Sequence, residues 1–253
     1  MKFSIITTSF NSIKTIESCI NSIKSQNYSN LDLIWIDNSS SDGTYEYLEK
    51  YSSKSTQLIK VKNTNIVEAW NIGLEKSKGD IVCYLNSDDQ YFSENTINEV
   101  AKLFSDNNIN LVYSDIIYIN KNQKILRNWV CDKYFEGIRD HNYFKTKINN
   151  GWMPAHPGFF IKKGIISEIG NFNNKYKVSF DYDFMIRCLK SKNISAKYLN
   201  SKTVKMLAGG NSNKLKNILK KMSEDLEIIK ENEIGNLKTL ILKNIIKLPQ
   251  FFI

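Results

Sequence analysis

Four polar residues, Asn86, Ser87, Asp88 and Asp89, directly follow an apolar run from Ile81 to Leu85. Adjacent carboxylates repel each other, and a hard divalent cation with oxygen ligands, shared with a bound phosphate, relieves that repulsion. This chemistry predicts Mg²⁺ or Mn²⁺ holding a nucleoside diphosphate. A plain Asp-rich turn is the alternative interpretation of the same residues.

The apolar run must place these four residues. Gly79 and Asp80 precede it, and its length and composition predict a strand that is buried on both faces. Open α/β sheets bind ligands at the carboxyl edge, where the four polar residues would then lie. Earlier segments predict strands at 3–8, 31–36 and 57–62 and helices at 13–23, 44–51 and 66–76, the first capped by Asn11 and Ser12. This alternation predicts parallel pairing with right-handed crossovers.

The second half has a different pattern. A helix at 93–104 is followed by strand-like runs at 111–119 and 125–130, which predict a hairpin and therefore mixed pairing. Two prolines exclude a helix interior around His156. Asp181 and Asp183 precede a helical pattern, and capping its start is one interpretation of them. A flexible loop is expected at 206–212, before a long polar helix at 214–231.

Composition limits the class of protein. The 253 residues are 42% hydrophobic, enough for one large α/β domain or one domain with an appendage. The cysteines are far apart and predict reduced core residues rather than a metal site: Cys19, Cys83, Cys131 and Cys188. We expect neither a secretory signal nor a membrane-spanning run, and hence a cytoplasmic or membrane-peripheral protein. The net charge of +9 favours polyanionic partners: nucleic acid, nucleotide phosphates or anionic lipid.

The last segment is basic and amphipathic. Its expected apolar face comprises Leu237, Leu240, Ile241, Ile245, Leu248 and Phe252, and three lysines border it, Lys238, Lys243 and Lys247. This pattern predicts peripheral contact with an anionic membrane. A helix packed on the domain or on a second subunit is the alternative.

Six motifs in order carry a family resemblance: 4–11, 37–44, 68–73, 79–89, 153–157 and 180–183. Together they resemble the inverting family-2 glycosyltransferases of the GT-A fold, most closely the branch that makes bacterial exopolysaccharide, colanic-acid-like polymer and O-antigen. The resemblance covers about residues 2–212. It implies a Rossmann-like α/β fold with a mixed central sheet flanked by helices. Residues 1–90 would form the nucleotide-binding half, 91–212 the acceptor half, and 213–253 a C-terminal helical tail.

The resemblance also implies an activity. A family member moves a sugar from a nucleotide donor, usually UDP-linked, to a glycan or lipid-linked acceptor with inversion, using Mn²⁺ or Mg²⁺. The process would be the synthesis of bacterial surface polysaccharide, at the cytoplasmic face of the inner membrane. Which sugar, acceptor and linkage are used would depend on the region from Tyr91 to Asn150.

Roles follow from the matched positions. The nucleoside would contact Thr7 to Ser9, Asn11 and Asp37, and the diphosphate would lie near Asn71 and Gly73. Asn86, Ser87 and Asp88 occupy the family's Asp-x-Asp site, with Asp88 as the metal ligand and Asn86 in place of the first Asp. Asp42 either holds a turn position of the family or only stabilises the turn.

The resemblance assigns the acceptor side as well. Asp181 matches the Asp of the Glu-Asp catalytic motif, although Phe180 replaces the Glu. A carboxylate there can take the proton of the attacking acceptor hydroxyl, and Asp183 would support the start of the helix. His156 would assist the leaving group, contact the acceptor or brace its loop.

Two other classes remain open. A nucleic-acid-binding module would fit the +9 charge and the interleaved Tyr and Lys, but no recognised nucleic-acid motif occurs and the basic residues are spread out. A sugar nucleotidyltransferase would share the α/β nucleotide half and the metal carboxylate, but it would release pyrophosphate. No G-x-G-x-x-G or Walker lysine loop is present, which disfavours dinucleotide binding and P-loop chemistry.

Overall fold

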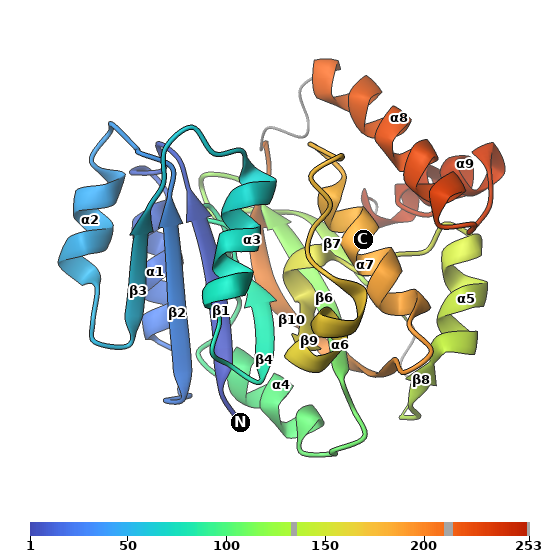
Figure 1. The fold of residues 1–253 in the computed structure, drawn as a ribbon, viewed down its shortest axis with the longest axis horizontal. Coiled ribbons are helices and arrows are strands. Elements are labelled where there is room, and N and C mark those ends of the chain that lie inside the picture. The colour runs from blue at the N-terminus through green and yellow to red at the C-terminus, as the bar shows by residue number, and fades with distance from the viewer. Residues whose placement is uncertain (133–135, 210–214, 252–253) are drawn as a thin grey trace.

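The first half of the chain alternates strands with helices. A computed structural model describes residues 1–132, 136–209 and 215–251 (Figure 1). The strands are β1 (Phe3–Ser9), β2 (Leu31–Asp37), β3 (Thr56–Lys60) and β4 (Ile81–Tyr84), and the helices are α1 (Ile16–Lys24), α2 (Thr44–Tyr51) and α3 (Ile66–Lys76). β1 pairs in parallel with both β2 and β4, and β2 pairs in parallel with β3. The predicted parallel α/β half is confirmed.

Helix starts in this half differ from one another. At α3, the Asn65 side chain accepts hydrogen bonds from two backbone N–H groups of the first turn, and Glu68 accepts from the Asn65 N–H, which makes a capping box. The predicted cap of α1 by Asn11 and Ser12 is wrong, since α1 begins at Ile16 without a side-chain cap. Asn11 instead has a positive φ of 51°. Its side-chain oxygen accepts from the Ser41 N–H at 2.9 Å.

The second half extends the same sheet with mixed directions. Its elements are β5 (Gln90–Tyr91), α4 (Thr96–Phe104), β6 (Leu111–Ile119), β7 (Ile125–Trp129), β8 (Arg139–Asp140), α5 (His141–Asn149), η1 (His156–Gly158), β9 (Phe159–Lys162), α6 (Lys163–Ile169), α7 (Phe180–Lys190) and β10 (Ser195–Leu207). The strand order is β3-β2-β1-β4-β9-β6-β10-β5, with β7 on β6 and β8 on β10. The antiparallel β6–β7 pair confirms the predicted hairpin. β9 and β10 are strands that the sequence patterns did not predict.

Strand direction brings several loops to one edge of the sheet. β9 runs antiparallel to both β4 and β6, so β4 and β6 point the same way, and β10 is parallel to β6. The carboxyl ends of β1, β2, β4, β6 and β10 therefore share one edge with the amino end of β9, at the top of Figure 1. Ser9, Asp37, the loop after β4 and His156 all lie along this edge.

The core lies between the sheet and the helices on its two faces. In Figure 1, α3, α6 and α7 lie on the near face and α1 on the far face. Gly73 shows how closely α3 packs, because a Cβ there would lie 2.4 Å from Cγ2 of Ile6 on β1. A side chain at this position would push α3 away from the sheet. All four cysteines are buried and free, as the sequence predicts.

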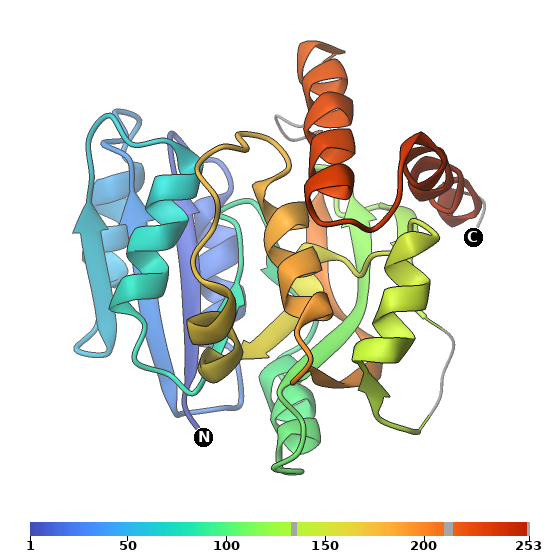
Figure 2. The same cartoon turned by 45° about the vertical axis from the view of Figure 1, so that its right-hand side comes forward.

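The C-terminal helices α8 (Leu215–Glu231) and α9 (Leu237–Ile245) and the turn η3 (Leu248–Phe251) join the same core. Ile228 and Ile229 of α8 and Leu240 of α9 are buried, and α8 packs on α7 and α9. Figure 2 shows α9 beside α5. Gly151 lies against α9 and has a φ of +81°. A Cβ on it would lie 2.4 Å from the backbone nitrogen of Lys243. No helix among the described residues has the length and apolar character to cross a membrane.

The predicted apolar face of the tail needs correction. Leu240 and Lys243 face the protein and are only 3% exposed. The exposed stripe consists of Leu237, Ile241, Ile245 and Leu248, at 50–57%. Phe252 lies outside the described residues, as do 210–214, which contain the last three residues of the loop predicted at 206–212 and the predicted domain boundary. The first two residues of that predicted loop belong to β10. The boundary itself stays a prediction.

Candidate active site

The loop after β4 is closed by Asp89. This carboxylate is 1% exposed and accepts hydrogen bonds from Asn86 Nδ2 at 3.0 Å and from the Leu207 N–H at 3.2 Å. Burial, together with the charge of Asp88, raises the pKa of Asp89. Asp89 therefore shapes the loop and ties it to the end of β10. Of the two adjacent carboxylates, Asp89 therefore has a structural role in the loop.

Asp88 is the carboxylate of this loop that reaches solvent. It is partly buried, which raises its pKa because a charged form loses hydration there. The amide nitrogen of Asn86 donates to Asp89, which leaves the Asn86 side-chain oxygen as a further oxygen ligand for a cation. Ser87 Oγ lies 2.8 Å from Ser12 Oγ and links the loop to the segment after β1.

The Asp88 carboxylate and the Asn86 side-chain oxygen fit one kind of metal site. Among the described residues, no cluster of three or more His, Cys, Asp or Glu side chains could enclose an ion. Mg²⁺, however, is commonly held by one or two carboxylates plus substrate phosphates and water. A single carboxylate whose charge is penalised by burial, beside a neutral amide oxygen, suits an ion that takes its remaining ligands from a diphosphate.

The loops after β1 and β2 are locked together by Asp37. Its carboxylate is fully buried and accepts from Ser9 Oγ at 2.7 Å, from the Ser40 N–H at 2.8 Å and from Ser40 Oγ at 2.6 Å. Asp37 therefore fixes the position of Ser9 and of the turn that follows β2. A direct contact between Asp37 and a nucleobase stays a prediction.

Two neighbouring residues complete this side of the edge. Asp42 accepts from the N–H and hydroxyl of Thr44 and from the Ile13 N–H. Although burial acts the other way, these bonds lower the pKa of Asp42, and its turn-stabilising role is visible directly. Thr7 Oγ1 is buried and has no hydrogen-bond partner in the described part of the chain.

Asn71 ties the two halves together. Its side-chain nitrogen donates to the Phe172 carbonyl at 3.0 Å, and its oxygen accepts from the Phe172 N–H at 2.9 Å. Both polar groups of Asn71 are thus used within the protein, and Gly73 faces the sheet. Their predicted place beside the diphosphate remains untested. The observed role of Asn71 is to fasten the segment before α7 to α3.

An aromatic cluster lies beneath the edge. Trp70 stacks on Tyr84 at 4.5 Å, lies 4.7 Å from the His156 ring and meets Phe180 edge-on at 5.5 Å. Phe180, which replaces the Glu of the family motif, therefore fills a packing position. Burial lowers the pKa of His156 while the charge of Asp181 opposes the change, so the imidazole is neutral at pH 7. Within the described structure His156 Nε2 is buried and unpartnered.

Asp181 lies in the first turn of α7, partly exposed, with Oδ1 accepting from the Tyr182 N–H at 2.8 Å. Burial raises the pKa of Tyr118 to about 12, and Asp89 and Asp181 both add to this rise. Next to Tyr118, Ile119 at the end of β6 pairs with Leu207, whose N–H donates to Asp89 of the loop after β4. Phe180, beside Asp181, packs on Trp70, which stacks on Tyr84 at the end of β4. The predicted metal loop and the predicted base are therefore both positioned around the end of β4.

The segment before α7 is held by a residue that the sequence patterns did not reveal. Glu224 of α8 accepts three backbone N–H bonds, from Lys177 at 3.0 Å and from Val178 and Ser179 at 2.8 Å. These donors lie immediately before α7, so Glu224 fixes the approach to Asp181. A glutamate 43 or more residues away in sequence gives no local signal of such a role.

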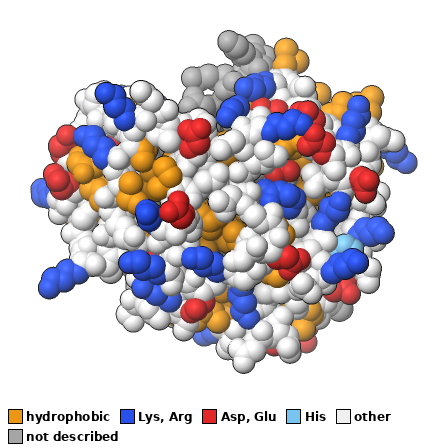
Figure 3. Space-filling view, viewed as in Figure 1, with side chains coloured by type: hydrophobic (Ala, Val, Ile, Leu, Met, Phe, Trp, Pro, Cys, Tyr) orange, Lys and Arg blue, Asp and Glu red, His pale blue; other side chains and the backbone are white. Residues whose placement is uncertain are grey.

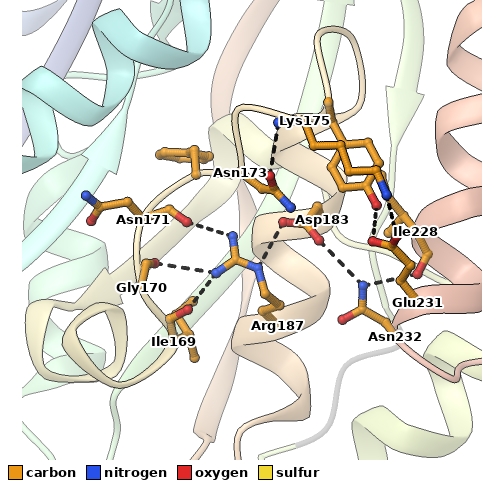
Figure 4. A network of polar contacts seen from close by, with 12 residues as sticks. Ile169, Gly170, Asn171, Asn173, Lys175, Asp183, Arg187, Ile228, Glu231 and Asn232 are labelled. Carbon is orange, nitrogen blue, oxygen red and sulfur yellow. Dashed lines mark hydrogen bonds and ion pairs between the residues drawn. The ribbon is translucent and has the colours of Figure 1, made fainter.

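Asp183 supports α7 by an ion pair (Figure 4). Its Oδ2 accepts from Arg187 Nε at 2.9 Å, and Arg187 also donates to the carbonyls of Ile169 and Asn171 at 2.7 and 2.8 Å. The Asn232 side chain reaches the other oxygen of Asp183 at 3.5 Å. The carboxylate therefore anchors the 169–171 turn to α7, where capping of the helix start had been one interpretation.

The fold is that of a GT-A glycosyltransferase. A family model described as glycosyl transferase family 2 matches residues 4–170. The chain belongs to this family, as its motifs predict. The match begins in β1 and ends just after α6.

Individual relatives agree with the family. A PGL/p-HBAD biosynthesis glycosyltransferase of Mycobacterium bovis is 26% identical over 202 residues, which cover 78% of this chain and 73% of the relative. The poly(ribitol-phosphate) beta-N-acetylglucosaminyltransferase TarS of Staphylococcus aureus is 28% identical over 124 residues, 47% of this chain and 21% of TarS.

Solved structures share the fold. TarS 1–349 in complex with UDP-GlcNAc superposes with a TM-score of 0.68 at 18% identity, covering 90% of this chain and 67% of that one. Another crystal structure of TarS 1–349 is matched over 65% of its length. A Pyrobaculum calidifontis mannosyltransferase in complex with GDP-Man and Mn²⁺ gives a TM-score of 0.64 at 15% identity, over 99% of this chain and 73% of that one. The match thus spans about two thirds of the length of TarS 1–349.

Proposed function

We propose that this glycosyltransferase moves a sugar from a UDP-linked donor to a hydroxyl of a glycan or lipid-linked acceptor, with inversion, in bacterial surface polysaccharide synthesis. The observation that carries the proposal is that the end of β4 and the start of α7 meet at Trp70, which stacks on Tyr84 and packs edge-on against Phe180. A donor-side carboxylate and an acceptor-side carboxylate at one sheet edge suit a single displacement. The UDP-GlcNAc bound to TarS and the Mn²⁺ bound to the mannosyltransferase support the choice of donor and ion.

On the donor side, Asp88 with the Asn86 oxygen would hold Mn²⁺ or Mg²⁺. Such an ion offsets the negative charge that builds up on a departing diphosphate. The segment from Thr7 to Ser9, with Asn11 and Asp37, shapes the site for the nucleoside, and Asp37 orients the Ser9 hydroxyl. Asn71 and Gly73 keep α3 and the segment before α7 close to the same edge.

On the acceptor side, Asp181 takes the proton of the attacking hydroxyl as the new glycosidic bond forms. Glu224 fixes the backbone that leads to Asp181, and Asp183 anchors the turn behind it. His156 is a neutral imidazole whose buried Nε2 has no partner among the described residues, and it would assist the leaving group, contact the acceptor or brace its loop. Attack from the Asp181 side, opposite the leaving diphosphate, inverts the anomeric carbon.

A donor screen tests this function without knowledge of the acceptor. UDP-, GDP- and dTDP-sugars are incubated with the protein and Mn²⁺, and the released nucleotide is identified. We expect slow release of UDP from one UDP-sugar, and its loss in excess EDTA. Formation of UTP and a sugar 1-phosphate when pyrophosphate is added would identify a sugar nucleotidyltransferase instead. Full release of UDP in EDTA would contradict the metal-dependent mechanism.

We also propose peripheral contact with the cytoplasmic face of an anionic inner membrane. The support is the exposed stripe of Leu237, Ile241, Ile245 and Leu248, with Lys238 exposed beside it. Hydrophobic and basic side chains gather over α8 and α9 at the upper right of Figure 3. Lys243 is buried, so it adds no attraction to lipid headgroups, and the attachment is weaker than three surface lysines would give.

Flotation with anionic liposomes tests this contact. Removing α9 would expose core residues such as Leu240, so the sharper variant is Ile241→Ser with Ile245→Ser, which changes only the exposed stripe. We expect the wild type to float in low salt and the double variant to remain at the bottom. Equal flotation of both would show that the stripe makes no membrane contact.

A further inference from the structure

A cavity of about 180 Å³ lies between β7 and the C-terminal helical segment. Its wall is formed by Trp129, Val130 and Cys131, by Gly151, Trp152 and Met153, and by Lys243, Ile246, Lys247 and Gln250. None of these residues belongs to the donor or base positions described above. The cavity combines aromatic rings with two lysines, and Lys247 Nζ lies 5.3 Å from the Trp129 ring centroid.

The cavity is next to the catalytic helix. Lys243 Nζ lies 3.2 Å from the ring centroid of Tyr182, the residue that follows Asp181. It also pairs with Asp225 of α8 at 2.6 Å, and the same carboxylate oxygen receives Lys221 at 2.8 Å. Although burial opposes its ionisation, these two lysines hold the pKa of Asp225 at about 2. One carboxylate is thus shared by two lysine side chains, although burial lowers the pKa of Lys243 well below its ordinary value.

Lys247 is a further lysine beside this group. It is half-buried and makes no ion pair with the described residues. Burial, followed by the charge of Lys221, lowers its pKa to about 8 against the pull of Asp225 and Asp181. Among the described residues, Lys221, Lys247 and Arg127 therefore face two carboxylates, Asp225 and Asp181. An anion beside Lys247 would be stabilised by this excess of positive charge.

We propose that this cavity binds the phosphate group of the acceptor substrate, with Lys247 as its main counter-charge and Trp129 and Trp152 as its apolar walls. The acceptor hydroxyl would then lie toward Asp181, which interacts electrostatically with Lys247 and Lys221. The inference rests on the proposed function, because it names the acceptor of that same site. It restricts the acceptor to phosphate-bearing molecules.

The cavity lies on the side of β6 that faces the donor loops. β10 pairs along one edge of β6, while β9 pairs with Leu111 to Tyr113 and β7 with Ile116 to Ile119 on the other edge. At about 4.8 Å between neighbouring strands, β9 is on the order of 10 Å from β1. Saturation with UDP must therefore separate a phosphate at Lys247 from the donor diphosphate in the test.

Direct binding tests the inference apart from catalysis. The full chain is first titrated with UDP and Mn²⁺, which reports on the donor site, and the saturated protein is then titrated with farnesyl phosphate or with glycerol 3-phosphate. We expect binding of at least one phosphate, weakened at least tenfold by Lys247→Met. Lys238→Met is the matched control, since Lys238 is exposed on the same α9 face as the outer stripe; it should bind as the wild type does.

A pH series gives a second readout. Because Lys247 loses its proton near pH 8, phosphate affinity of the wild type should fall between pH 7.5 and 9, and Lys247→Met should lack this fall. The charged groups that face Lys247 are Lys221 and Asp225 of α8, Arg127 of β7, Asp181 of α7 and Lys243 of its own segment. Asp225, with a pKa of about 2, keeps its charge through the series.

The outcomes are distinct. Tighter binding of farnesyl phosphate than of glycerol 3-phosphate identifies a lipid-linked acceptor, and the reverse order identifies a polyol phosphate. Equal affinities of Lys247→Met and Lys238→Met, or no binding of either phosphate to a protein that binds UDP, would overturn the inference and leave the proposed function standing. Failure to bind UDP counts against the proposed function. If Lys247→Met does not fold, Lys247→Gln replaces it.

Discussion

The two halves of the active site are held in different ways. On the donor side, Asp37, Asp42 and Asp89 each accept bonds from groups on the same or neighbouring loops, such as Ser40, Thr44 and Asn86. On the acceptor side, the segment before Asp181 depends on Glu224, some 45 residues further along the chain. Apart from the bonds of Asp89 to Leu207 and of Asn71 to Phe172, the donor loops are held by contacts nearer in sequence. The approach to Asp181 is held by a distant helix.

This difference has a functional meaning. A turn that is held by contacts close in sequence can keep its shape when residues elsewhere in the chain are substituted. Such turns suit a site for the nucleotide, which different sugar donors have in common. The acceptor side depends on the packing of α8 and α9 against α7, so changes in those helices can alter the acceptor cavity without disturbing the donor loops. Variants on the two sides should therefore fail differently.

The largest fall in donor turnover is expected for Asp88→Asn. Loss of the one loop carboxylate that reaches solvent should cost several kcal/mol of leaving-group stabilisation, a fall of about 10³-fold in donor turnover. Unfolding temperature should change little, since the Asp88 side chain has no hydrogen bond or ion pair with another of the described residues. Glu75→Gln, on the exposed end of α3, is the control. Turnover by the Asp88 variant at wild-type rates in Mn²⁺ would remove Asp88 from the metal site.

On the acceptor side, Glu224→Gln should affect stability and transfer together. The variant loses a charged acceptor for three backbone donors that are otherwise desolvated, a cost of about 2 kcal/mol in the free energy of unfolding. Transfer should fall about tenfold because Asp181 is less well positioned, while donor affinity is kept. Glu227→Gln, an exposed ion pair on the same helix, should cost under about 1 kcal/mol. If both variants changed the free energy of unfolding and the transfer rate equally, Glu224 would have no positioning role.

Asp183→Asn should lower stability with a smaller effect on chemistry. The buried carboxylate is replaced by an amide, which weakens the Arg187 pair that anchors the 169–171 turn, at a cost of about 1–3 kcal/mol. Asp106→Asn breaks a more exposed ion pair with Lys197 and should cost less than about 1 kcal/mol. Denaturant unfolding of both variants measures the contrast, and a larger loss for Asp106→Asn would contradict it.

The smallest effect concerns His156 and pH. Burial lowers its pKa below the ordinary 6.5, so between the folded-state pKa and 6.5 the unfolded chain binds the proton and the folded chain does not. Stability should therefore fall as pH drops below 6.5, by at most about 1.4 kcal/mol per pH unit from this group. His156→Gln should flatten that part of the profile. An unchanged slope between pH 6.5 and 5.5 would show that another group titrates.

Sequence patterns revealed the donor half well. The strands before Asn11, Asp37 and Asp88 are apolar runs with polar loops, and that alternation carries its own signal. They did not reveal that Asp89 turns inward or that Asn71 binds the Phe172 backbone, since both depend on contacts with segments about a hundred residues away. The tail shows the same limit. Leu240 and Ile241 are one residue apart and equally apolar, and only packing decides which is buried.

The central claim is that Asp181, and not Asp183, is the catalytic base. Donor affinity and transfer rate should be measured for Asp181→Asn and Asp183→Asn with the sugar donor found in the screen and its acceptor. We predict that Asp181→Asn binds donor as the wild type does and loses about 10² to 10⁴ in transfer rate, the usual contribution of a positioned base. Asp183→Asn should keep most of its transfer rate while its unfolding midpoint falls. A folded Asp183→Asn without transfer, beside an active Asp181→Asn, would contradict the account and exchange the two roles.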